Sequence, residues 1–223
     1  MIFAHQELES EFDTENGCYN TLVVEQQDMF TRLLTDFYEQ GRGFPGKSMI
    51  YSSQNTALPF SKSVCVLGSF VPLDLNRKPL LNKIIAAMEK NALSAENYSR
   101  TQRVLTDVEM LFEDIRIDLP CDMAFENLSV SALLKAASPV LSDESTSLAE
   151  RVLELMELIC TYEGERLFIT VCMRDYVGDE EMQHFAESAI SHGYGILALE
   201  THERTLLKNE CRVIIDKDLC EIA

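Results

Sequence analysis

Two apolar strands separated by one amphipathic helix, late in the chain, restrict the possible folds more than any other feature. RLFITVCM (166–173) is a continuous apolar run, DEEMQHFAESAISHG (179–193) has apolar residues at helical spacing, and YGILALE (194–200) is apolar again. A strand–helix–strand unit of this length predicts two parallel strands joined by a right-handed crossover. CRVIID (211–216) is a further strand candidate. Together these patterns predict an α/β core.

The first part of the chain is expected to add to the same core. NTLVVEQ (20–26) ends a strand-like stretch, and QDMFTRLLTDFYEQ (27–40) has the spacing of an amphipathic helix. Two further strand candidates follow at 48–53 and 61–70. Both ends of the chain therefore contribute strands to one core.

The middle of the chain has a different pattern. Residues 79–119 contain no glycine and keep a helical apolar spacing, which predicts one or two long helices with Pro79 in a first turn. Further helices are expected at 128–138 and 145–164. We therefore predict an α/β fold with a central mixed sheet and an inserted α-helical domain. The expected domains are an α/β domain of residues 1–72 and 141–223 and a helical domain of residues 73–140.

GRGFPGKS (41–48) matches the phosphate-loop pattern G-x-x-x-x-G-K-[ST] at every required position. A working loop follows a buried strand and precedes a helix, whose N–H groups then face the phosphates. Here a predicted helix precedes the motif and a strand-like stretch follows it, while Pro45 removes one N–H group. The sequence therefore favours a glycine-rich turn from helix to strand. Nucleotide hydrolysis through residues 41–48 stays as an alternative.

Other catalytic patterns are missing from the sequence. The four histidines are isolated, and neither H-E-x-x-H nor G-x-S-x-G occurs, so we expect that the protein is not an enzyme. The seven cysteines show no C-x-x-C spacing, which favours structural thiols in a reducing cytoplasm over a disulfide framework. The apolar runs are short and no secretory signal is visible. We expect a cytoplasmic protein with no membrane partner.

The charge of the chain is unevenly distributed. A net charge of −18 argues against a polyanionic partner when it is considered globally, but screening makes the local distribution decisive. Between residues 77 and 103 there are six basic residues and two acidic ones, and acidic segments lie on both sides. The six basic residues are Arg77, Lys78, Lys83, Lys90, Arg100 and Arg103. They form either a local anion-binding segment or a solvated helix face.

A group of acidic residues follows the basic segment. Asp114, Asp118, Asp122 and Glu126 recur every four residues, and Pro120 prevents one continuous helix through all of them. Several carboxylates around a helix-to-loop break suit a hard cation such as calcium, which takes six to eight oxygen ligands. A solvated acidic face explains the same residues without any metal.

Several stretches together resemble the ring-forming adaptation protein of type II-A CRISPR systems. They are LNRKPLLNKIIAAMEK (75–90), the run Asp118-Leu119-x-x-Asp122, and the tail from RLFITV through DEEMQHFAESAISHGYGILALETHER. The likeness lies in the order and spacing of elements from about residue 19 onward. It rests on the succession of these motifs and not on any single one. Arg116 stands where the family has a carboxylate, and residues 123–126 are additional.

The resemblance implies a fold and a function. It implies an ATPase-like α/β head without a nucleotide site, a helical leg, and a homotetrameric ring stabilised by calcium. Such rings take double-stranded DNA from free ends without catalysis and assist acquisition of new spacers. The implied partners are the CRISPR integrase complex and the RNA-guided effector nuclease. The basic segment would then face the DNA, and Asp114, Asp118, Asp122 and Glu126 would be the calcium ligands.

Three functions therefore compete at the level of sequence. The first is a sequence-independent, DNA-encircling accessory protein, whose phosphate contacts would make binding strongly dependent on salt. The second is the nucleotide hydrolase. The third is an oligomeric scaffold that binds proteins and no DNA.

Overall fold

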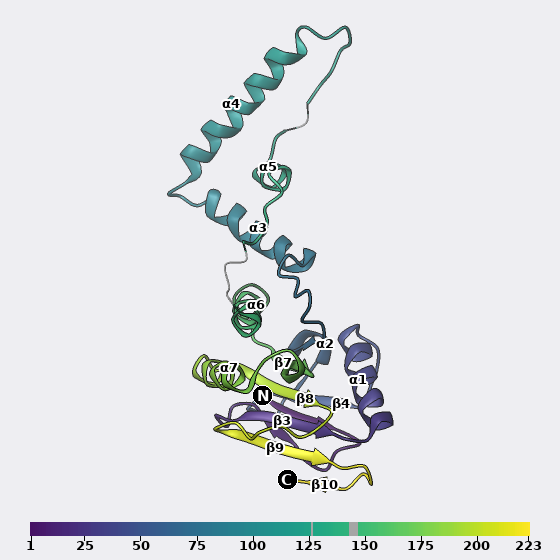
Figure 1. Ribbon diagram of the computed structural model, residues 1–223. Helices are drawn as coiled ribbons and strands as arrows, with labels where there is room; N and C mark the ends of the chain where they lie inside the picture. The colour runs from purple at the N-terminus through teal and green to yellow at the C-terminus, as the bar shows by residue number, and fades with distance from the viewer. Residues whose placement is uncertain (126, 143–146) are drawn as a thin grey trace. The chain divides into compact units, whose positions relative to one another are not determined.

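The computed structural model describes residues 1–125, 127–142 and 147–223 (Figure 1). The chain divides into two compact units, Met1–Leu73 with Glu144–Ala223, and Asp74–Asp143. The division expected from the sequence fell at 72/73 and 140/141. The first unit carries two sheets with their helices, and the described elements of the second are helices.

The larger sheet of the first unit has six strands in the order β10-β9-β3-β8-β7-β6. The strands from β9 to β6 run parallel to one another, and β10 is antiparallel to β9, so the sheet is mixed. This confirms the predicted α/β class. The bounds are Tyr19–Val24 for β3, Val64–Leu67 for β6, Leu167–Val171 for β7, Gly195–Glu200 for β8, Glu210–Ile215 for β9 and Glu221–Ile222 for β10.

The predicted strand–helix–strand unit is present. Helix α7 (Asp179–Ser191) connects β7 to β8, which pair in parallel (Figure 1). Its first turn carries Asp179, Glu180 and Glu181, whose negative charges favour the N-terminal end of the helix dipole. Helix α6 (Leu148–Glu163) precedes β7, and it begins after Ser147, which caps it by accepting a hydrogen bond from the Glu150 N–H.

One face of the large sheet packs against the N-terminal sheet and α1 (Gln27–Gly41). Leu22 of β3 and Leu197 of β8 belong to one buried cluster with Phe37 of α1 and Phe3 of the small sheet. The small sheet is antiparallel, in the order β2-β1-β4-β5. Its strands are β1 (Ile2–His5), β2 (Phe12–Asp13), β4 (Ser48–Tyr51) and β5 (Ala57–Leu58), and the short helix α2 (Phe60–Ser63) leads into β6.

Residues that point to the other face of the large sheet contact α7. The rings of Tyr19 and Phe185 lie edge to face with centroids 6.3 Å apart, and both side chains are buried. Because side chains bury on both faces, every residue of β7 and β8 is buried, and the two strands are mainly apolar with no apolar–polar alternation. This is why the sequence presented them as continuous apolar runs.

The second unit contains α3 (Lys78–Ala92), α4 (Tyr98–Arg116) and α5 (Val130–Ala136). The apolar spacing over 79–119 therefore gives two helices, and Pro79 lies in the first turn of α3 as predicted. The Thr101 hydroxyl donates to the Ala92 carbonyl oxygen at 2.8 Å, which fastens the start of α4 to the end of α3. Large apolar side chains on α4 remain exposed, including Met110 and Ile115.

The cysteine prediction was wrong at two positions. Cys18 and Cys211 form a disulfide across a sequence separation of 193 residues. The residues lie at neighbouring positions because β3 and β9 pair in parallel, with Asn20 opposite Cys211. No local spacing motif could show a contact between strands so distant in sequence. Among the remaining cysteines, Cys65 and Cys172 are partly buried.

Candidate nucleic-acid interface

The phosphate-loop motif lies in a turn of the opposite order to a nucleotide site. Helix α1 ends at Gly41 and strand β4 begins at Ser48, so the helix enters the motif and the strand leaves it. The Lys47 ammonium forms an ion pair with the Glu7 carboxylate, Nζ to Oε1, at 2.5 Å. Lys47 is therefore committed within the protein, as expected for a structural turn.

Side chains of α1 accept hydrogen bonds from the backbone N–H groups that would otherwise face a phosphate. The Lys47 N–H donates to Asp36 Oδ1 at 3.0 Å, and the Ser48 N–H donates to Gln40 Oε1 at 3.0 Å. A Cβ at Gly46 would lie 2.3 Å from the Gln40 side chain, so this glycine is required by close packing on α1. Side chains of α1 thus take the place that a phosphate would need, and this geometry argues against the nucleotide alternative.

The six predicted DNA-binding residues lie on two helices of the second unit. Arg77 is the N-cap residue of α3, which carries Lys78, Lys83 and Lys90. Arg100 and Arg103 lie in the first two turns of α4. Lys83 and Lys90 are seven residues apart, which places them on one face of α3, and the same reasoning places Arg100 and Arg103 on one face of α4.

These six cations are available to a ligand. Lys78, Lys83, Lys90, Arg100 and Arg103 are exposed, and Arg77 is half-buried, with its Nε donating to the Asp74 carbonyl oxygen at 3.2 Å. Within residues 1–125, 127–142 and 147–223, no ion pair involves any of the six. Lys47, Arg174 and Arg204, in contrast, are all paired with carboxylates.

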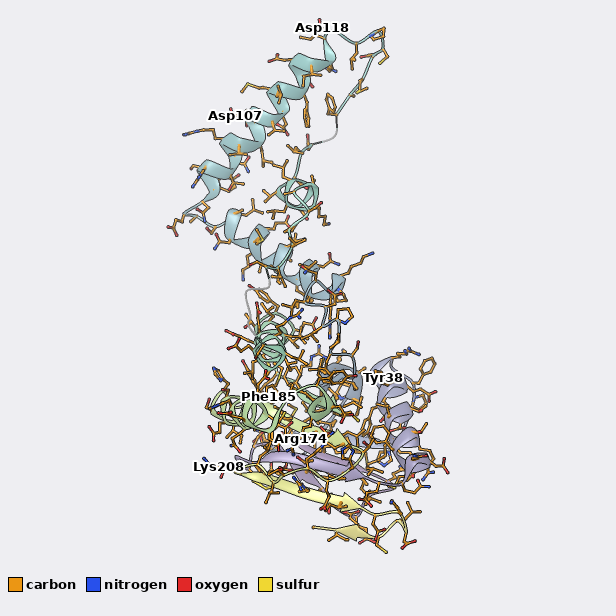
Figure 2. The ribbon with its side chains drawn as sticks, viewed as in Figure 1. Tyr38, Asp107, Asp118, Arg174, Phe185 and Lys208 are labelled. Carbon is orange, nitrogen blue, oxygen red and sulfur yellow. A yellow bond between two sulfur atoms is a disulfide. The ribbon has the colours of Figure 1, made fainter. Side chains whose placement is uncertain are left out.

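The predicted calcium ligands are dispersed along the end of α4 and the segment after it. Asp114 lies in the last turns of α4, whereas the helix ends at Arg116, so Asp118 already lies in the following turn (Figure 2). Asp122 follows in irregular chain, and Glu126 lies outside the described residues. The three described carboxylates are exposed.

This arrangement does not fit a metal site within one copy of the chain. Among the described residues no three or more His, Cys, Asp or Glu side chains are arranged to hold a metal ion. Arg116 places a positive charge in the same region, since it pairs with Glu113 and donates to the Met123 carbonyl oxygen at 2.5 Å. The three described carboxylates therefore form no complete calcium site by themselves.

A buried charge network in the first unit was not recognised from the sequence. Arg174 follows β7, and its side chain is 2% exposed. Its guanidinium donates to Asp179 Oδ1 at 2.9 Å and to the Thr205 carbonyl oxygen at 2.8 Å, and lies 3.9 Å from the buried carboxylate of Glu210. Arg174 therefore ties the chain between β8 and β9 to the start of α7.

Glu200, at the end of β8, is the most perturbed carboxyl group of this region. Burial raises its pKa to about 7, and the Arg174 N–H, which donates to Oε1 at 3.4 Å, opposes that rise. Glu200 lies in LETHER (199–204), the end of the tail that carries the resemblance, and its burial was not foreseen from the sequence. Arg204, the last residue of that stretch, pairs with the Asp175 carboxylate. Asp175 is therefore part of a structural ion pair.

Comparison with known proteins places the chain in a family. Residues 45–219 match the family of CRISPR-associated proteins called Cas_Csn2, so the chain belongs to that family. Comparison with curated protein sequences found no match. Among solved structures, Stu0660 of Streptococcus thermophilus is similar with a TM-score of 0.57 and 14% identity, over 95% of this chain and 74% of that one. At this identity the likeness shows the fold.

Membership of the family implies a role in CRISPR adaptation. The recognition made from the sequence is thereby confirmed at the level of the family and the α/β fold. Among the described residues, no helix combines the length and apolar character needed to cross a bilayer.

Proposed function

We propose that the protein is a non-catalytic, sequence-independent binder of double-stranded DNA ends that assembles as a homotetrameric ring and assists spacer acquisition. The observation that supports this most is the set of six unpaired cations on α3 and α4 within the described chain, in a protein of net charge −18. Lys47 and Arg174 of the first unit, in contrast, are paired with carboxylates. Cations left unpaired on one helical unit are suited to phosphates.

Symmetry would strengthen this weak local charge. Four copies would bring the six cations of each chain around one duplex, while the acidic remainder of the surface would repel DNA elsewhere. Phosphate contacts alone carry no sequence information, so binding should be independent of sequence. The proposed protein partners are the CRISPR integrase complex and the RNA-guided effector nuclease.

Calcium is proposed separately, as a structural ion that Asp114, Asp118, Asp122 and Glu126 would hold together with oxygens from another copy. Its test is direct calorimetric titration of the metal-free protein with calcium, followed by light scattering. Binding without a change in assembly, or no binding, would contradict a structural role for the ion.

The DNA proposal is tested by a gel-shift assay on linear and closed circular duplexes over a range of salt. The double variant Lys83→Glu/Lys90→Glu should abolish the shift of linear DNA, because it reverses two exposed charges on one face of α3. The double variant Lys62→Glu/Lys208→Glu is the matched control, since both lysines are exposed and lie in the first unit. Each lost phosphate contact should lower the slope of log K against log salt by ~0.9.

Two results would contradict the proposal. Equal loss in both double variants would mean that net charge alone governs binding. A stable assembly that never shifts linear DNA, even at low salt, would favour the protein-binding scaffold.

A further inference from the structure

Residues 201–209 connect β8 to β9, and we call this segment the strap. Strand β3 lies between β8 and β9 and runs parallel to both, so the strap returns from the end of β8 to the beginning of β9. Apolar packing holds it at Leu207, which is buried, whereas the neighbouring Leu206 is 63% exposed. The path of the strap therefore depends largely on hydrogen bonds from neighbouring side chains.

Two arginine side chains hold the first half of the strap. The Arg174 guanidinium donates to the Thr205 carbonyl oxygen at 2.8 Å. Arg212 of β9 donates through Nη1 to the Arg204 carbonyl oxygen at 2.9 Å. The Arg174 and Arg212 side chains are 2% and 12% exposed, so both contacts are shielded from water.

Two backbone N–H groups of the second half are also bonded to side chains. The Leu207 N–H donates to Glu210 Oε2 at 2.8 Å. The Lys208 N–H donates to Gln183 Oε1 of α7 at 2.8 Å, and Figure 2 labels Lys208. These bonds protect the two amide hydrogens from exchange with solvent for as long as the strap stays closed.

The sheet face that begins at the strap is polar. Strand register places Arg212 of β9, Thr21 of β3 and Thr170 of β7 in one row, with Ala198 of β8 between the two threonines. Both threonine hydroxyls are buried, and neither has a hydrogen-bond partner among the described residues. A segment that closes beside such groups gains less free energy than one that closes over apolar side chains.

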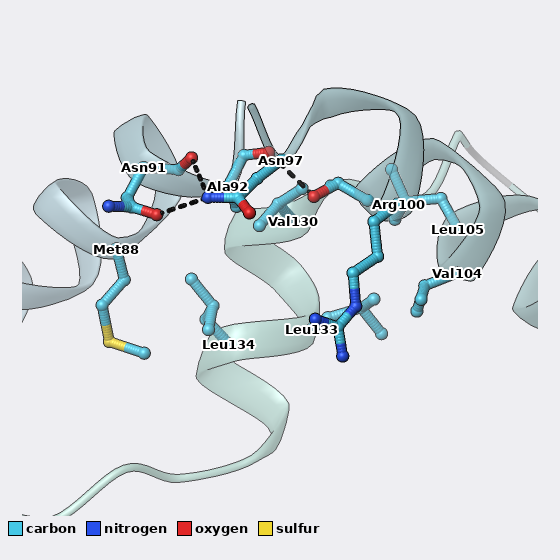
Figure 3. A pocket seen from close by; sticks show the side chains of 11 residues that line it. Met88, Asn91, Ala92, Asn97, Arg100, Val104, Leu105, Val130, Leu133 and Leu134 are labelled. Carbon is cyan, nitrogen blue, oxygen red and sulfur yellow. Dashed lines mark hydrogen bonds between the residues drawn. The ribbon is translucent and has the colours of Figure 1, made fainter. Parts of the chain in front are cut away.

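The second unit shows the opposite case. The groove between α3, α4 and α5 is lined mainly by apolar side chains, among them Met88, Val104 and Leu134 (Figure 3). Apolar contacts of that kind do not change with protonation, whereas the contacts around the strap can.

Glu200 lies where the strap begins, and its carboxyl group is buried without an ion pair among the described residues. The residue is 2% exposed, and the Arg174 N–H donates to Oε1 at 3.4 Å. An ionised carboxylate in this position would lose its water without gaining a close cation. Burial therefore favours the protonated form and raises the pKa of Glu200 to about 7.

The titratable and charged groups that face Glu200 come from the strap, from β3 and from the chain after β7. Asp175 raises the pKa of Glu200, whereas Arg174 and Arg204 lower it. The set consists of Arg174 and Asp175 of the 3-10 helix η1 (Met173–Asp175), Arg204 of the strap, Tyr19 of β3 and Cys172 between β7 and η1.

We propose that Glu200 and the strap form a proton-operated latch, in which the strap is closed while Glu200 is protonated and opens when Glu200 ionises. The ionised carboxylate requires a cation, and Arg174 is adjacent because its own N–H already contacts Glu200. A guanidinium that turns to Glu200 releases the Thr205 carbonyl oxygen, and water then reaches the polar row. The inference goes beyond the proposed function, because the latch needs neither DNA nor a second copy.

The test is hydrogen exchange of the full chain without DNA between pH 5 and pH 8, corrected for the intrinsic exchange rate at each pH. With a pKa of about 7 when the strap is closed and the ordinary 4.5 when it is open, opening becomes more favourable as pH rises and levels off above about pH 7.5. The protection of the Leu207 and Lys208 amides should therefore fall on the order of 50-fold between pH 5 and pH 8.

Three variants separate the latch from a general effect of pH. Glu200→Gln should keep the strap protected at every pH, since it cannot ionise. Glu203→Gln is the matched control, because it changes an exposed carboxylate of the same strap, and it should give the profile of the parent protein. Asp175→Asn removes a negative charge that raises the pKa of Glu200, so it should move the loss of protection to lower pH.

Three results would overturn the inference. The first is strap protection that does not change between pH 5 and pH 8 in the parent protein. The second is the same pH profile in Glu200→Gln as in the parent protein. The third is a loss of protection that spreads equally over β3, β7 and α7, because the whole unit and not the strap would then open.

Discussion

Arg174 is the residue whose removal tests most directly how the first unit is held together. Its side chain is 2% exposed and lies near Glu210, whose carboxylate is fully buried. Removing one member of a buried ion pair costs about 3–5 kcal/mol, because the other charge is left without compensation. Glu210 keeps a second partner in Arg212, Nε to Oε1, at 2.7 Å. We therefore expect the lower end, about 3 kcal/mol, for Arg174→Met.

The measurement is urea and thermal unfolding followed by circular dichroism. A loss of about 3 kcal/mol corresponds to a fall in Tm of about 6–12 °C for a chain of this size. Arg204→Met is the matched control: Arg204 also pairs with an aspartate, but both side chains are partly exposed, so it should cost less than about 1 kcal/mol. A loss below ~1 kcal/mol for Arg174→Met, or equal losses in the two variants, would refute the reasoning.

Three further predictions follow from individual contacts. Because the folded-state pKa of Glu200 is raised to about 7, its contribution to stability is complete below pH ~4.5 and is lost as pH rises through about 7. Glu200→Gln should therefore remove a pH dependence of the unfolding free energy on the order of 3 kcal/mol. Identical pH profiles of the unfolding free energy in the parent protein and the variant would contradict this. Lys47→Ala should cost under ~1 kcal/mol by urea unfolding, since its ion pair is exposed, and a fluorescent ATP analogue should bind neither protein; binding that the substitution abolishes would restore the nucleotide alternative. Reducing the Cys18–Cys211 disulfide should destabilise the fold by about 5 kcal/mol, because it closes 193 residues; Cys18→Ser should behave like the reduced protein and Cys220→Ser like the oxidised one, and an unchanged urea midpoint on reduction would show that the crosslink contributes nothing.

Local patterns in the sequence determined most of the secondary structure. Apolar runs gave β7 and β8, and helical spacing gave α1 and α7, because these signals depend on neighbouring residues only. The same local reasoning identified the turn at 41–48, where helix and strand order contradicts a phosphate loop. The succession of elements also sufficed to recognise the family.

The candidate interface was predicted only in part. The clustering of six cations is visible in the sequence, and the structure adds that they are unpaired within the described chain. The exposed apolar residues of α4, Val104, Leu111 and Ile115, were not distinguished from its buried ones, because periodicity marks every apolar face alike. Whether a face is covered depends on what packs against it. The alternating spacing of residues 104, 108, 111 and 115 was the signal available.

Contacts between distant residues were decided by the tertiary structure alone. The disulfide and the pairing of Arg174 with Glu210 both depend on the position of β9, which carries Glu210 and Cys211, beside β3. The two strands are far apart in sequence. The raised pKa of Glu200 has the same origin, since burial follows from what covers the end of β8. Sequence periodicity specifies which side of an element is apolar, whereas strand order and register specify its neighbours. Those neighbours set the charge state of a buried group and the partner of a thiol.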